Sequence, residues 1–101
     1  MAKKIIWTET SVKDRFQIYQ FWLTNNQSNS YSEKLERLFN ESAKLISLFP
    51  EIGTKTDFPE IRVKVIRDFK IFYRERIDSI EIIRVWDTRR KPTDLQIKLS
   101  D

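Results

Sequence analysis

The apolar residues of the first half of the chain recur at the spacing of a helix, and those of the second half alternate as in strands. A short strand is predicted over residues 3–8, which contain Ile5, Ile6 and Trp7. Thr8 is expected to cap a helix that runs to about Thr24. The apolar stripe predicted for this helix comprises Val12, Phe16, Tyr19 and Leu23, widened by Ile18 and Trp22.

A second helix is predicted between a polar loop at residues 25–30 and Pro50. Ser30 and Glu33 have the spacing of a capping box. The apolar row that follows consists of Tyr31, Leu35, Leu38, Ser42, Leu45 and Phe49, with Phe39 and Ile46 beside it. Pro50 ends the helix, and Gly53 lies just beyond it. Two helices joined by a short polar loop predict an antiparallel hairpin.

Three further strands are predicted at residues 61–65, 69–73 and 80–86, with turns near residues 67–68 and 77–79. Connections this short favour an antiparallel meander. The pattern predicts a single α+β domain over residues 1–101, with an N-terminal strand and a two-helix hairpin packed on one face of a small, mostly antiparallel sheet. The other face is expected to look outward. Residues 93–101 are expected either to add a strand or to be mobile.

The composition excludes several classes of site. The chain has 101 residues with no cysteine and no histidine, which rules out disulfides, thiolate zinc sites and a Ser-His-Asp triad. Its one glycine, Gly53, excludes glycine-rich phosphate loops. We therefore predict no metal and no cofactor. Since no apolar run has the length of a membrane span or the form of a secretory signal, we expect no membrane partner and a cytoplasmic location.

The net charge of +4 is concentrated in one third of the chain. Residues 61–92 carry ten basic and five acidic side chains, whereas residues 1–60 are balanced. A local basic excess favours an anionic partner, either nucleic acid or an acidic protein segment. A solvated strand face would explain the same excess without any partner.

The sequence resembles the RelE/ParE superfamily, the toxins of type II toxin–antitoxin systems. The resemblance extends over about residues 3–95, and the segments that carry it are residues 6–8, 48–53, 69–73 and 82–92. It implies the same order of strand, helices and sheet. It also implies a growth-inhibiting toxin that a cognate antitoxin silences, wrapping as an extended or helical segment along the helical hairpin and an exposed sheet edge.

The superfamily offers two activities, because RelE-like members cut messenger RNA in the ribosome and ParE-like members poison DNA gyrase. By resemblance, a ribonuclease would use Arg62, Lys64, Lys70 and Arg90, with Arg89 a near alternative to Arg90. The tyrosine or histidine that would transfer protons is missing, since no tyrosine follows Tyr73. We therefore favour ParE-like inhibition, with enzymatic activity left open. The expected target-binding residues are Arg62, Lys64, Arg67, Lys70, Arg84, Arg89 and Arg90. A non-toxic basic module that binds nucleic acid is the third possibility.

Overall fold

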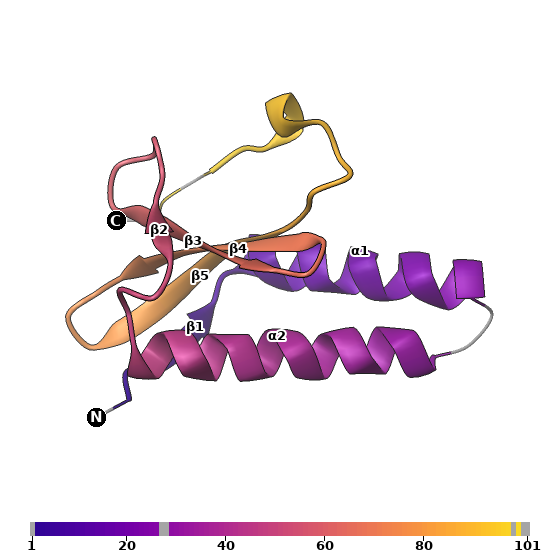
Figure 1. Ribbon diagram of the computed structural model, residues 1–101, viewed down its shortest axis with the longest axis horizontal. Coiled ribbons are helices and arrows are strands. Elements are labelled where there is room, and N and C mark those ends of the chain that lie inside the picture. The colour runs from indigo at the N-terminus through magenta and orange to yellow at the C-terminus, as the bar shows by residue number, and fades with distance from the viewer. Residues whose placement is uncertain (1, 27–28, 98, 100–101) are drawn as a thin grey trace.

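In the computed structural model, two antiparallel helices lie along one face of a five-stranded sheet (Figure 1). The structure describes residues 2–26, 29–97 and 99. Its elements are β1 (Lys4–Trp7), α1 (Glu9–Asn26), α2 (Ser30–Leu48), β2 (Thr54–Lys55), β3 (Ile61–Ile66), β4 (Phe69–Glu75), β5 (Ser79–Asp87) and the 3-10 helix η1 (Pro92–Asp94).

The strand order of the sheet is β1-β5-β4-β3-β2. β1 runs parallel to β5, and the other neighbouring strands are antiparallel. The predicted α+β fold is confirmed, including its mostly antiparallel sheet. The short edge strand β2 adds a fifth strand to the four that the sequence pattern predicts. None of the helices in the described residues is long and apolar enough to cross a membrane.

The main core lies between the hairpin and the sheet. Phe39 of α2 and Phe69 of β4 meet edge to face with ring centroids 5.3 Å apart, and both are fully buried. Tyr73 and Ile82 complete this layer from the middle of the sheet. Tyr73 alternates with Phe69 and Ile71 along β4, and all three side chains therefore lie on the side of the helices.

The packed face of α1 is rotated from the predicted stripe, of which Ile18 and Trp22 do contribute to the main core. Val12 and Phe16 are 53% and 63% exposed, whereas Ser11, Asp14 and Ile18 are buried. The reason is a polar contact. β1 ends opposite Ile82, and among the described residues no strand pairs with the rest of β5 on that side. Asp14 fills the gap by accepting a hydrogen bond from the Val85 amide, which turns this face of the helix inward.

The packed face of α2 is also rotated from the predicted row. Leu35, Phe39 and Ile46 are buried as expected, but Leu45 and Phe49 remain exposed. The inner face includes small residues, namely Ser32, Ser42, Ala43 and Ser47. These small side chains allow close approach, and Ser32 donates a hydrogen bond to the Tyr19 carbonyl of α1.

The starts of the two helices differ in how well the sequence predicts them. Thr8 caps α1 as expected, because its hydroxyl oxygen accepts a hydrogen bond from the Ser11 amide. Ser30, the predicted cap of α2, is already helical, and Asn29 holds the cap position. Asn29 instead donates its side-chain amide to the Glu33 carboxylate, so the capping-box prediction is wrong by one residue.

The sheet face opposite the helices carries a second, smaller core, which corrects the expectation that it simply looks outward. Ile61, Phe72, Ile83 and Trp86 are buried there, and Leu95 and Ile97 of the tail pack against them. The tail crosses over this face (Figure 1), and Arg84 donates to the Gln96 carbonyl. Its described residues, 93–97 and 99, form no added strand.

Candidate functional site

Arg62 and Lys64 share the helix-side face of β3, as their spacing predicts. The same face includes Ile66, which belongs to the main core, and Lys64 lies opposite Ile71 in the sheet register. Arg62 donates a hydrogen bond of 2.8 Å to the Gly53 carbonyl. One of the two cations is therefore tied to the loop after α2.

Lys70 lies on the other face of the sheet, and Arg90 lies just past the end of β5, between that face and α1. Lys70 is exposed and stands opposite Trp86 of β5, a residue of the second core. The Arg90 guanidinium is 4.4 Å from the centre of the Trp86 ring. The sheet thus separates Lys70 from Arg62 and Lys64. Arg90 lies past the end of β5, and the four residues do not converge on one phosphate-sized site.

The other predicted target-binding residues are also distributed. Arg67 is exposed in the turn between β3 and β4, with a left-handed backbone φ of 54°. Arg84 forms a two-pronged ion pair with Asp14, at 2.8 and 2.9 Å. Arg89 pairs with Asp87 and covers the aromatic residues of α1. Arg84 and Arg89 are therefore partly committed to holding the fold.

Tyr73 has no freedom to act as a proton donor for a substrate. Its hydroxyl accepts a hydrogen bond from the Gly53 amide and donates one to the Pro50 carbonyl, at 2.9 and 2.7 Å. Burial raises the pKa of Tyr73, partly offset by the hydrogen bond from Gly53. A Cβ atom at Gly53 would lie 2.7 Å from this hydroxyl, so only glycine fits.

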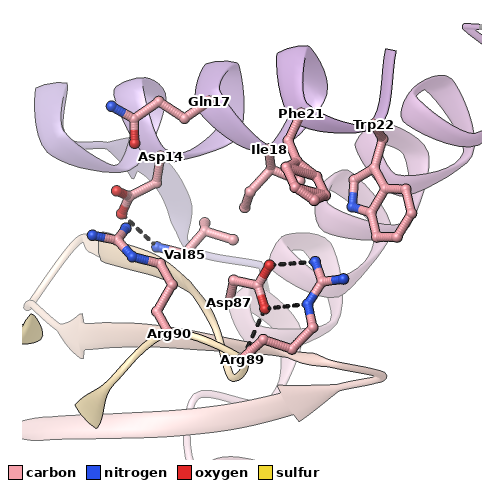
Figure 2. A pocket seen from close by; sticks show the side chains of 9 residues that line it. All are labelled: Asp14, Gln17, Ile18, Phe21, Trp22, Val85, Asp87, Arg89 and Arg90. Carbon is pink, nitrogen blue, oxygen red and sulfur yellow. Dashed lines mark hydrogen bonds and ion pairs between the residues drawn. The ribbon is translucent and has the colours of Figure 1, made fainter. Parts of the chain in front are cut away.

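A pocket that sequence reasoning missed lies between α1 and the end of β5 (Figure 2). We call it the α1–β5 pocket. Its volume is about 430 Å³, and its lining residues are Asp14, Gln17, Ile18, Phe21, Trp22, Val85, Asp87, Arg89 and Arg90. Of these, only the two arginines were predicted from the sequence as target-binding residues. Asp14 and Phe21 were not, because their partners lie about 70 residues away along the chain.

Asp87 and Arg89 form the polar end of this pocket. The Arg89 side chain and amide both donate to the Asp87 carboxylate. Burial alone would raise the pKa of Asp87, but the hydrogen bonds from Arg89 outweigh it and hold the pKa below its usual value. The same pairing raises the pKa of Arg89. The Arg89 guanidinium lies 4.9 Å from the Trp22 ring centre, so this pair joins β5 to α1.

An apolar patch is exposed where α2 ends. It consists of Leu45, Leu48, Phe49 and Ile52, which are 37% to 59% exposed. The patch adjoins β3, because Arg62 is bonded to Gly53 in the same loop. β2 pairs with Arg62 and Val63, and Thr56 donates to the Ile61 carbonyl, so within the described residues the open edge of β3 is residues 64–66. We call these two features the α2 patch and the β3 edge.

No group of three or more histidine, cysteine, aspartate or glutamate side chains in residues 2–26, 29–97 and 99 could hold a metal ion. The acidic residues near the α1–β5 pocket are instead paired with arginine.

Comparisons with known proteins agree with this architecture. Residues 5–92 match the family described as the ParE toxin of the type II toxin–antitoxin system parDE. A solved structure, titled as the chromosomal ParDE toxin–antitoxin system from P. aeruginosa, superposes with a TM-score of 0.74 at 18% identity. That match covers 85% of this chain and 96% of the other, and it shows a shared fold. No curated protein matches the sequence significantly.

Proposed function

We propose that this chain, which belongs to the ParE toxin family of type II toxin–antitoxin systems, arrests growth by binding DNA gyrase. The family match over residues 5–92 is the observation that carries the proposal. Gyrase acts on chromosomal DNA, so the proposed site of action is the cytoplasm. A ParD-like antitoxin is the proposed silencing partner.

The geometry of the site supports inhibition by binding to a target rather than by cleavage of RNA. Cleavage needs a general base, a general acid and cations that converge on one phosphate. Here the sheet separates Lys64 from Lys70, Tyr73 is occupied by backbone partners, and the sequence has no histidine. The basic side chains are instead distributed over both faces, which suits contact with a large partner.

The test of the target is induction of the full chain in a bacterial host, with DNA synthesis and translation followed by pulse labelling. We expect DNA synthesis to fall first, together with an SOS response. A host whose gyrase carries a resistance mutation provides the control and should continue to grow. A rapid fall in translation with intact replication would contradict the proposal and indicate a RelE-like ribonuclease.

We further propose that the antitoxin covers the α2 patch and the β3 edge. An extended segment can add to an open strand edge through backbone hydrogen bonds, and apolar side chains beside it can fill the patch. Arg62 and Lys64 on β3 and Arg67 in the next turn would then favour acidic residues in that segment. This surface is apolar at its centre and basic at one side, which is the complement of an acidic amphipathic segment.

Paired substitutions test this surface. Phe49→Glu places a charge in the α2 patch, while Phe16→Glu places the same charge on the exposed apolar face of α1. With the protein encoded beside this chain as the partner, we expect Phe49→Glu to weaken binding at least tenfold and Phe16→Glu to change it much less. Equal loss from both substitutions, in chains that remain folded, would contradict the assignment.

A further inference from the structure

The α1–β5 pocket has a composition that indicates a ligand of its own, separate from the proposed antitoxin surface. Its volume of about 430 Å³ falls in the range of small-molecule and side-chain binding sites. One wall comes from α1 and the other from the last residues of β5 and the segment after it (Figure 2). The α2 patch and the β3 edge contribute no residue to it.

The wall on the α1 side is apolar and firmly held. Ile18 and Val85 are almost fully buried at the base, while Phe21 is 46% exposed. The Phe21 ring packs edge-on against Trp22 at 5.1 Å, and Trp22 packs in the same way against Tyr31 at 4.8 Å. A ligand group that covered Phe21 would gain apolar burial without having to order this wall.

Among the charges of the pocket, Arg90 is the one that forms no ion pair within the described residues, although its charge also helps to lower the pKa of Asp87. Asp14 is neutralised by Arg84, and Asp87 is neutralised by Arg89. Arg90 stacks on Trp86 and, in the described part of the chain, forms no ion pair. An anionic group would therefore find a cation here that needs no existing ion pair to be broken.

The geometry points to the α1–β5 pocket as a binding site for an apolar monocarboxylate. Its aromatic or branched aliphatic part would lie on Ile18, Phe21 and Val85, and its carboxylate would pair with Arg90. Gln17 also lines the pocket. A nucleotide or other multiply charged ligand fits less well, because the pocket has a single unpaired cation.

Two sources could present this chemistry: a free aromatic acid, or the last residue of a peptide that ends in phenylalanine. Both carry an apolar ring within a few bonds of one carboxylate. The inference does not depend on the gyrase proposal, because it concerns a pocket whose occupancy can be measured on the isolated chain.

The first test is an NMR titration of the ¹⁵N-labelled full chain with 3-phenylpropionate and with its neutral amide. The Trp22 indole nitrogen is buried and has no hydrogen-bond partner within the described residues, which makes its N–H signal a sensitive reporter of packing around it. We expect the Trp22 indole and the Val85 amide to shift. The carboxylate should bind about fivefold more tightly than the amide, as expected for a partly exposed ion pair.

Variants separate the charge from the apolar wall. Arg90→Gln should remove the preference for the carboxylate while leaving the weaker binding of the amide unchanged. Lys91→Gln is the matched control, because it removes a neighbouring exposed cation outside the pocket lining. Phe21→Ala should weaken both ligands. Unchanged amide signals elsewhere in the sheet confirm that each variant is folded.

Peptides then distinguish the two sources. A pentapeptide ending in phenylalanine is compared with the same peptide bearing a C-terminal amide. Tight binding of the free-carboxylate peptide identifies a peptide terminus, whereas binding of 3-phenylpropionate alone identifies a free acid, and either result supports the site. The inference is overturned if no probe shifts the Trp22 signal, or if acid and amide bind equally to the unmodified chain.

Discussion

Asp14 fastens α1 to the open side of β5. It is 5% exposed and accepts hydrogen bonds from Arg84 and from the Val85 amide. Asp14→Asn breaks a buried ion pair and leaves the Arg84 charge without its partner. The substitution should therefore lower the free energy of unfolding by about 2–4 kcal/mol. Denaturant titration followed by far-UV circular dichroism measures this loss.

The control for Asp14→Asn is Glu9→Gln on the same helix. Glu9 pairs with Lys13, but both side chains are largely exposed. Exposed pairs contribute little, so this substitution should leave the unfolding midpoint unchanged. A midpoint that moved equally in the two variants would show that Asp14 has no special role.

The Asp87–Arg89 pair makes the stability depend on pH in the acid range. The pKa of Asp87 is lowered in the folded chain, so the pair contributes its full stability above the unfolded value of 3.8. The contribution is lost as the pH falls from 3.8 through the folded pKa. We expect Asp87→Asn to be less stable than the natural chain at pH 6, and this gap to be smaller at an acid pH well below 3.8. Thermal unfolding at both pH values measures it, and a constant gap would exclude this linkage.

At the scale of single residues, the sequence could predict contacts along one strand and not those across the fold. The shared face of Arg62 and Lys64 follows from their spacing alone. The pairing of Asp14 with Arg84 joins residues 70 positions apart, and no local pattern encodes it. The α1–β5 pocket depends on that pairing and so could not be predicted.

At the scale of elements, the sequence could predict where the two helices lie along the chain, but it could not predict which face of each helix packs on the sheet. α1 has apolar side chains on two sides, so periodicity identified the helix and selected the row that contains Val12 and Phe16. The packed face was decided by Asp14 and by the free end of β5. The exposed row on α1 and the exposed Leu45 and Phe49 on α2 are surfaces that a partner can use.

This orientation predicts unequal effects of truncating apolar residues in the helices. Ile18→Ala and Phe39→Ala remove buried groups and should each cost about 2–5 kcal/mol of unfolding free energy. Phe16→Ala deletes a larger side chain than Ile18→Ala but should cost less than about 1 kcal/mol, because Phe16 remains in contact with water. Chemical denaturation of the three variants decides between this face and the row predicted from the sequence. A larger loss at Phe16 than at Ile18 would favour the predicted row.

At the scale of the whole molecule, the sheet is covered on both sides, and the two covers differ in kind. The hairpin buries one face with two long helices, and the tail covers the other with two half-buried side chains, Leu95 and Ile97. The alternation in the tail was visible in the sequence, but it does not distinguish a paired strand from an unpaired segment that packs across the sheet. We call the segment around Leu95 and Ile97, which packs in the second way, the strap. The tail packs across the sheet because the second core beneath it offers an apolar surface to Leu95 and Ile97.

Because the strap covers the second core, we expect the tail to make a small contribution to the stability of the chain. A chain ending at Lys91 should still fold, because the main core lacks no residue, but it should lose about 1–3 kcal/mol as the second core is uncovered. For a domain of this size, that loss corresponds to a fall in Tm of very roughly 5–20 °C. Differential scanning calorimetry measures it, with near-UV circular dichroism reporting on Trp86.

Point variants in the full chain separate the strap from the mere length of the tail. Leu95→Ala combined with Ile97→Ala should reproduce most of the loss, since these two side chains make the contact with the second core. Leu99→Ala should have little effect, because Leu99 is 40% exposed and lies outside that cluster. If truncation at Lys91 left Tm unchanged, the tail would contribute nothing to stability, and the second core would be stable without it.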